Sequence, residues 1–275
     1  MEVTAARPLA IRHLEIHAAH ACNLACESCA HYSDYAHKGV VSLDEARGWM
    51  APWSERLAPL TFSILGGEPT IHPDLVGFLE LSRRMFPRAT LRLVTNGFFL
   101  GRHPQLPEFM ARDRNAILYL SIHHDSPEYR ERVEPVIGLL REWKRRHGIL
   151  AEVYHSTRHW TRRYRGHGAG MQPYADEAPR ASWEACDSKF CPQLFEGRIW
   201  KCAPLAYLPM QHARFHLPEQ WSPYLAYRPL EPGCSGEALA EFFSREEERQ
   251  CGMCPARPEA MKLPMPIRAV KREPA

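Results

Sequence analysis

The sequence has no run of apolar residues that approaches the ~18 to 20 needed to cross a membrane. Its start, Met1 to Arg7, lacks the apolar stretch of a secretory signal peptide. Net charge is also scarce, because 35 Lys and Arg against 32 Asp and Glu leave a formal charge of +3. A chain with so little net charge has no strong general attraction for nucleic acid. These absences predict a cytoplasmic protein whose partners include neither a membrane nor a nucleic acid.

Cysteine, by contrast, is plentiful, with nine in 275 residues. The chain is 45% apolar and 24% charged, which is typical of a globular protein, and it is long enough to bury a sizeable core. In a reducing compartment, cysteines are more often metal ligands than disulfide partners. We therefore expect the cysteines to bind metal.

Three of these cysteines, Cys22, Cys26 and Cys29, have the spacing C-x3-C-x2-C directly after a strand-like segment. Thiolates are the usual ligands of four-iron clusters. Three thiols hold three irons and leave the fourth open, and an open metal position is a reaction site. Zinc is the alternative, because His20 and His31 flank the cysteines, but no fourth Cys or His falls at the usual finger spacing.

Three motifs in this order resemble those of the radical S-adenosylmethionine (SAM) enzymes. They are the cysteine triplet, residues 62–69 ending in Gly-Gly-Glu-Pro, and residues 91–97, and the resemblance covers roughly residues 10–155. It implies that the triplet holds a [4Fe-4S] cluster whose open iron binds SAM. The reduced cluster would cleave SAM to a 5'-deoxyadenosyl radical that abstracts hydrogen from a substrate. It also implies a flavodoxin or ferredoxin as electron donor.

Short apolar strands alternate with helical stretches in the first 155 residues. We expect strands at residues 12–18, 61–65, 91–95, 117–122 and 150–154, and helices at 43–57, 73–86, 108–113 and 128–147. Ser42 with Glu45 three residues later predicts a capping box at one helix start. Such alternation predicts an α/β fold of parallel βα units. The resemblance makes residues 1–155 a partial (β/α)6 TIM-like barrel.

Functional groups of such barrels gather at the carboxyl ends of the strands. The resemblance makes Gly66, Gly67, Glu68, Pro69, Asn96 and Ser121 candidate SAM-binding residues. His123 and His155 are candidate catalytic acids or bases. For each there is a plainer interpretation: Glu68 and Asn96 as turn residues, and the histidines as satisfied polar side chains near a cavity.

The pattern changes after residue 155. Residues 156–185 are an expected linker, and residues 186–255 contain the other six cysteines, with a predicted hairpin around Glu196-Gly197. This segment resembles the auxiliary-cluster domains called twitch and SPASM. The resemblance implies one auxiliary [4Fe-4S] cluster held by Cys202, Cys251, Cys254 and either Cys186 or Cys191, with zinc as the alternative. Cys234 is then a spare thiol, and residues 256–275 form an expected disordered tail.

A short core with one auxiliary cluster resembles the members that act on sugars and aminocyclitols. We therefore expect an oxidoreductase or epimerase of a small polar substrate, with dehydrogenation preferred. Epimerisation would need a thiol that returns hydrogen, either Cys234 or whichever of Cys186 and Cys191 is not a ligand. The alternatives are a peptide (RiPP) maturase that works with a separate leader-binding partner, and a non-catalytic iron–sulfur or zinc protein.

Overall fold

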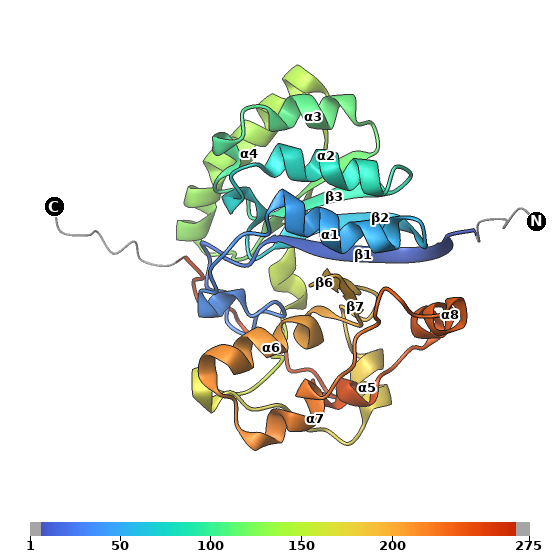
Figure 1. Ribbon diagram of the computed structural model, residues 1–275. Helices are drawn as coiled ribbons and strands as arrows, with labels where there is room; N and C mark the ends of the chain where they lie inside the picture. The colour runs from blue at the N-terminus through green and yellow to red at the C-terminus, as the bar shows by residue number, and fades with distance from the viewer. Residues whose placement is uncertain (1–6, 268–275) are drawn as a thin grey trace, which may run out of the picture.

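The computed structural model describes residues 7–267 and centres on a seven-stranded sheet with the order β5-β4-β3-β2-β1-β6-β7 (Figure 1). Neighbouring strands are parallel except for the pair β6–β7. The strands are β1 (Leu9–Ala19), β2 (Leu57–Gly66), β3 (Thr90–Thr95), β4 (Ala116–Ile122), β5 (Leu150–His155), β6 (Gln193–Phe195) and β7 (Arg198–Trp200).

Four helices connect the first five strands: α1 (Leu43–Ser54), α2 (Leu75–Met85), α3 (Leu106–Arg112) and α4 (Pro127–His147). All nine elements expected in this part of the chain are present. The capping box is confirmed, because Glu45 N donates to Ser42 Oγ (3.2 Å) and Ser42 N donates to Glu45 Oε2 (2.8 Å). Among the described helices, none combines the length and the apolar character that a membrane span requires.

The α/β architecture is confirmed, but the sheet is open and the sixth parallel strand has an unexpected position. In a (β/α)6 arrangement the sixth strand would follow β5. Here β5 is an edge strand, and β6 pairs with β1 at the other side, with Glu15 opposite Gln193. In Figure 1 the βα units lie above β1, and the C-terminal elements α5 to α7 lie below it.

The main core lies between the sheet and helices α1 to α4. Alternate side chains of the central strands, such as Leu14, Ile16, Phe62, Leu91 and Leu93, are fully buried there. Each such side chain contributes roughly 1.5–3 kcal/mol on burial. This core fixes the strand ends from which the site is built.

A second core belongs to the C-terminal part. The predicted hairpin is present, and both turn residues have positive φ (Glu196 51°, Gly197 75°), the conformation of a two-residue hairpin turn. Trp53 Nε1 of α1 donates to the Gly197 carbonyl (2.8 Å) and ties this turn to the main core. The remaining helices are α5 (Pro179–Glu184), α6 (Ala203–Phe215), α7 (Ser222–Leu225) and α8 (Gly236–Ser244).

Two expectations about irregular chain need correction. The predicted linker is packed, since Tyr164 and Met171 are buried in the second core. The prediction of a disordered tail is wrong for residues 256–267, where Leu263 is buried and Ala25 N donates to the Pro266 carbonyl (2.7 Å). The apolar side chains between the prolines pack against Leu24 and hold this extended segment down. Residues 268–275 lie outside the described part.

Candidate active site

A cavity of about 490 Å³ opens where the parallel strands end. Cavities of this size hold small molecules and cofactors in other proteins. Most of the core site residues expected from the sequence line it together: Cys22, Cys26, Cys29, Gly66, Gly67, Glu68, Asn96, Ser121 and His123. Pro69 is buried at the start of a short 3-10 helix (Pro69–Ile71) and does not line the cavity.

The three clustered thiols share one wall of this cavity. Burial raises the pKa of the Cys26 thiol well above its ordinary value, and it raises that of Cys29 to about 11. Backbone and side-chain N–H groups face Cys22 Sγ, with Leu24 N at 3.3 Å and Asn96 Nδ2 at 3.9 Å. A set of three thiols with N–H donors to sulfur fits an iron–sulfur cluster. Protons must leave these thiols on metal binding, so metal affinity will depend on pH.

Gly66 and Gly67 are required by the close approach of the end of β2 to the chain after β1. A Cβ atom at Gly66 would lie 2.1 Å from the Ala19 oxygen, and one at Gly67 would lie 2.3 Å from the Ala21 oxygen. Gly67 N and Glu68 N donate to these same two carbonyl oxygens, at 2.9 and 2.8 Å. Because both glycines lack a side chain, the cysteine loop can pack directly against the end of β2 and form these two hydrogen bonds.

Glu68 is 1% exposed and organises the loops around it. Its Oε1 accepts hydrogen bonds from the backbone and hydroxyl of Thr70 and from the hydroxyl of Thr95, and Oε2 accepts from Asn96 N (2.8 Å). Burial raises the pKa of this carboxyl, although the hydrogen bonds oppose the shift. Glu68 thus joins the ends of β2 and β3 in one network.

The side-chain amide of Asn96 has hydrogen-bond partners within the protein, whereas the resemblance predicted a contact with SAM. Its Nδ2 donates to Asn23 Oδ1 (2.8 Å), and its Oδ1 accepts from Phe98 N (3.2 Å). The side chain therefore holds the turn after β3 against the cysteine loop. The turn interpretation of Asn96 is supported, and it still lines the cavity.

The two candidate histidines differ in placement. His123 lies in the cavity wall, with Nδ1 3.6 Å from Cys26 Sγ and 3.3 Å from Ser156 Oγ, and burial lowers its pKa to about 4. His155 is exposed at the end of edge strand β5 and is not among the cavity residues. The expectation that His155 acts in catalysis therefore needs correction. Successive side chains of a strand face opposite sides, so the next residue, Ser156, faces the cavity instead.

Several cavity residues were missed by sequence reasoning. Trp160 and Arg163 come from the supposed linker: Trp160 Nε1 donates to the Glu27 carbonyl (2.8 Å), and Arg163 N donates to Ser28 Oγ (2.7 Å). Glu15 and Arg92 lie on β1 and β3 and face the same space. The alternation of side chains along the two strands is the one feature of the sequence that indicates which side of the sheet Glu15 and Arg92 face. Nothing in the sequence indicates that Trp160 or Arg163 lies at the cavity.

Four C-terminal thiols form a second group that does not line the cavity. They are Cys186, Cys202, Cys251 and Cys254. Burial raises the pKa of Cys202, and the charges of the other three thiols raise it further. Cys254 has a pKa of about 12, raised by burial and by Cys186 and Cys251. Arg163 Nη1 lies 3.7 Å from Cys186 Sγ, between this group and the cavity. Four thiols that influence one another's pKa match in number the donor set of a structural metal or cluster site.

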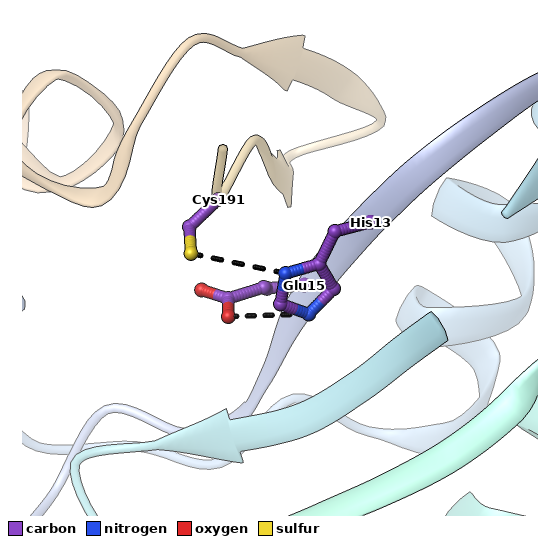
Figure 2. Close-up of side chains that lie close together, drawn as sticks. All are labelled: His13, Glu15 and Cys191. Atoms are coloured by element: carbon purple, nitrogen blue, oxygen red, sulfur yellow. Dashed lines mark hydrogen bonds and ion pairs between the residues drawn. The ribbon is translucent and has the colours of Figure 1, made fainter. Parts of the chain in front are cut away.

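Cys191 differs from those four thiols because it lines the cavity. Figure 2 shows it facing His13 and Glu15 of β1, with Sγ 3.8 Å from His13 Nδ1. One ligand atom of each residue lies within 4.8 Å of the others. Cys186, by contrast, does not line the cavity, and its charge raises the pKa of Cys202, Cys251 and Cys254.

Comparison with known families gives one match. The sequence model of the family described as the Radical SAM superfamily matches residues 16–163, more than half of the 275 residues. No curated protein matches the chain.

One of the similar solved structures supports the fold over nearly the whole chain. The crystal structure of BtrN in complex with AdoMet (SAM) and 2-DOIA has a TM-score of 0.51 at 15% identity, with 90% of this chain and 94% of that chain covered. anSMEcpe with bound AdoMet gives 0.43 at 18% identity, covering 55% of this chain and 46% of that one. SuiB from Streptococcus suis bound to S-adenosylmethionine gives 0.41 at 22% identity, covering 54% and 33%. The chain thus spans less than half the length of these last two proteins.

Proposed function

Because this chain belongs to the radical SAM superfamily, we propose that it reductively cleaves AdoMet and uses the resulting 5'-deoxyadenosyl radical to abstract hydrogen from a small polar substrate. The observation that carries the proposal is the shared cavity, where Cys22, Cys26 and Cys29 lie beside the Gly66-Gly67-Glu68 turn. When bound, a [4Fe-4S] cluster on the three thiolates supplies one electron to AdoMet. A flavodoxin or ferredoxin is the proposed source of that electron.

The chain's own residues prepare the site for this reaction. Glu68 and the glycine pair hold the cysteine loop, so that the three sulfurs keep their positions as the ligand binds. His123 is kept neutral by burial and lies against Cys26 Sγ, where an N–H can orient the sulfur. We therefore assign His123 a positioning role. Trp160 lines the cavity and is held there by the hydrogen bond from its Nε1 to the Glu27 carbonyl.

A small hydroxylated substrate fits the rest of the wall. Beyond the cysteine loop, the lining carries hydrogen-bonding groups of several kinds, including Glu15, Arg92, Tyr119, Ser188 and Arg163. A few polar groups in a concave site set the orientation of a small ligand. The BtrN structure, which has this fold over nearly its whole length, holds 2-DOIA beside AdoMet, and this supports a small molecule as the second ligand. The proposed outcome is dehydrogenation or epimerisation.

Cleavage of AdoMet by the anaerobically reconstituted protein tests the proposal. With dithionite as reductant, the protein should release 5'-deoxyadenosine and methionine. Cys26→Ala should abolish this release, because one of three cluster ligands is lost. Cys234→Ala is the matched control, since Cys234 does not line the cavity, and it should cleave AdoMet normally. Normal cleavage by Cys26→Ala would overturn the proposal.

The four-thiol group supports a second part of the proposal, an auxiliary [4Fe-4S] cluster held by Cys186, Cys202, Cys251 and Cys254. The support is their mutual electrostatic influence and their absence from the cavity wall that the cysteine triplet lines. Zinc is the alternative occupant, because it accepts the same four thiolates.

Metal content separates these possibilities and tests the choice of ligand. Reconstituted wild-type protein should contain about eight irons per chain, as expected for two four-iron clusters. Cys186→Ala should lose iron, whereas Cys191→Ala should retain the wild-type amount. Zinc in place of the second set of irons would identify a structural zinc site, and iron loss in Cys191→Ala alone would show that the ligand assignment is wrong.

A further inference from the structure

The position of Cys191 follows from how the hairpin joins the sheet. Glu15 pairs with Gln193 in the parallel β1–β6 ladder, so the residues two positions earlier, His13 and Cys191, also lie beside each other. Cys191 is in the cavity wall together with Glu15 and the cysteine triplet. The thiol is therefore presented to the same space in which the substrate is proposed to bind.

Hydrogen bonding assigns the proton positions around this thiol. Arg92 has only donors and its Nη2 lies 3.0 Å from His13 Nε2, so that nitrogen accepts and the ring proton resides on Nδ1. Nδ1 then carries the proton that faces Cys191 Sγ at 3.8 Å, and the Phe190 backbone is a further hydrogen-bond partner of this imidazole. The remaining partner of the thiol is the Glu15 carboxylate, which has only acceptors when ionised. The sulfur thus accepts from His13 and donates its S–H to Glu15.

The surroundings keep this sulfur protonated. Burial raises the pKa of the Cys191 thiol, and the charge of Glu15 raises it further. Glu15 is itself held by Gln193 Nε2 (2.6 Å), and Gln193 Oε1 accepts from Tyr207 Oη (3.1 Å). Arg92 opposes the binding of a metal cation here, because its guanidinium also lies 3.5 Å from Glu15 Oε1. A neutral S–H, held in a fixed direction in the wall of a reaction cavity, is suited to giving a hydrogen atom.

We propose that Cys191 is the hydrogen-atom donor to a carbon-centred radical formed in this cavity, with Glu15 and His13 as its positioning residues. This inference rests on the proposed cleavage of AdoMet. The S–H bond is weaker than the C–H bond that forms, so the transfer is downhill. A substrate that has lost hydrogen to the 5'-deoxyadenosyl radical receives hydrogen from Cys191 and becomes a closed-shell product. Cys191 becomes a thiyl radical, which takes one electron from a flavodoxin- or ferredoxin-class donor and one proton from solvent, so that the S–H group that donates to Glu15 is formed again.

The balance of this sequence defines the reaction class. One AdoMet, two electrons and one proton give methionine and 5'-deoxyadenosine, while the substrate exchanges one hydrogen for another at the same carbon. The substrate is therefore neither oxidised nor reduced. If the new hydrogen arrives from the opposite face, the carbon is inverted, so the substrate class is a small polar molecule with a C–H stereocentre. Cys191 thus changes the sequence-based preference from dehydrogenation to epimerisation.

Uncoupled AdoMet cleavage in deuterated water tests the donor without knowledge of the substrate. The probe is the 5'-deoxyadenosyl radical itself, formed from unlabelled AdoMet with dithionite and no added thiol. Wild-type protein should give 5'-deoxyadenosine with one deuterium at C5', because Cys191 S–H exchanges with solvent. Cys191→Ala should still release 5'-deoxyadenosine but lose the deuterium, and Cys234→Ala should retain it.

The results that would contradict AdoMet cleavage differ from those that would contradict the donor assignment. No 5'-deoxyadenosine from wild type would defeat the proposed AdoMet cleavage, and with it the premise of this inference. Release without deuterium from wild type, or equal deuterium from wild type and Cys191→Ala, would defeat the donor assignment alone.

A second measurement needs neither cluster nor AdoMet. Thiolate is the form that iodoacetamide alkylates, so Cys191 in the purified chain should react slowly at pH 8, as followed by peptide mass spectrometry. The groups that face the thiol are Glu15, His13, Arg92 and Cys186. Glu15→Gln removes the adjacent negative charge at nearly constant volume and should accelerate alkylation of Cys191 several-fold, while the rate at Cys234 stays the same. An unchanged rate at Cys191 would show that Glu15 does not hold the thiol proton.

Discussion

At the scale of single residues, the cavity brings together side chains that lie far apart in the sequence, from Cys22 to Cys191. The cysteine triplet lines the same cavity as Gly66, Gly67 and Glu68, as their positions after strands of one sheet predicted, whereas Pro69 lies outside the cavity wall. Spacing alone did not distinguish Cys186 from Cys191. That difference depends on the register of β6 against β1, which is a long-range pairing and leaves no local signal.

Glu68 shows how the role of a predicted residue changes once its partners are known. The resemblance made Glu68 a candidate SAM-binding residue, whereas the structure gives both of its carboxylate oxygens protein partners. A buried acceptor with several donors is costly to replace, because each donor would lose its partner. The residue therefore supports the site's architecture whether or not it also meets the ligand.

Glu68→Gln tests this structural role. The amide NH2 of glutamine would face hydrogen-bond donors, so we expect a loss of about 1–3 kcal/mol in the free energy of unfolding, measured by urea denaturation. Glu128→Gln is the control, because Glu128 forms only an exposed ion pair with Arg132 (2.9 Å). Such pairs contribute about 0.3–0.5 kcal/mol. Equal effects of the two substitutions would contradict a structural role for Glu68.

At the scale of elements, hydrophobic periodicity predicted the five strands and four α-helices that the structure describes between residues 7 and 155. Their boundaries shifted by only a few residues, because each element has one buried and one exposed side or is bounded by a clear cap. The edge strand β5 was found from its sequence although most of its residues are exposed.

Helix α6 was missed for a physical reason. Its residues from Ala203 to Leu208 are all buried, so the segment has no polar side and no amphipathic period. It also contains Pro204 and Pro209, which usually argue against a helix interior. Pro204 is tolerated because it lies in the first turn of the helix. A backbone N–H there has no acceptor within the helix, so the N–H that proline lacks is not missed. Tertiary packing against Trp221 and Tyr32, which the sequence does not reveal, stabilises this helix.

At the scale of the whole molecule, the C-terminal part is built into the core sheet. Strand β6 extends the sheet beyond β1, and Gln193 and Tyr207 reach the Glu15 network from that side. A substitution in the C-terminal part is therefore expected to alter the contacts of Glu15, which lines the cavity. The expected division into a core, a linker and an attached extension described the order of motifs along the chain, but it did not foresee this shared sheet.

Buried histidines make the stability of the whole fold sensitive to acid. Burial lowers the pKa of His13 to about 4, and it lowers the pKa of His17, which lies against His20 and His31, well below the ordinary value of 6.5. His37 and His72 are shifted in the same direction by burial. The unfolded chain therefore binds more protons than the folded chain between about pH 6.5 and 4.

We expect the free energy of unfolding to fall as the pH is lowered from 6.5 towards 4. Each unit by which a histidine pKa is lowered corresponds to about 1.4 kcal/mol. Glu15 and Glu68 act in the opposite direction, since burial raises their pKa values and acid then favours the folded state. More histidines than carboxyl groups are shifted, so the free energy of unfolding should be higher at neutral pH than in acid.

Urea denaturation of the cluster-free chain at several pH values between 7.5 and 4.5 measures that slope directly. His17→Gln removes one group that must stay neutral in the fold, so its stability should depend less steeply on pH than that of the wild type, whatever its stability at pH 7.5. His212→Gln is the matched control, because this histidine is exposed and its replacement should leave the slope unchanged. A wild-type stability that stays constant from pH 6.5 to 4.5 would show that the buried histidines do not limit the fold in acid. A slope that is the same in wild type and His17→Gln would exclude His17 as a source of the acid sensitivity.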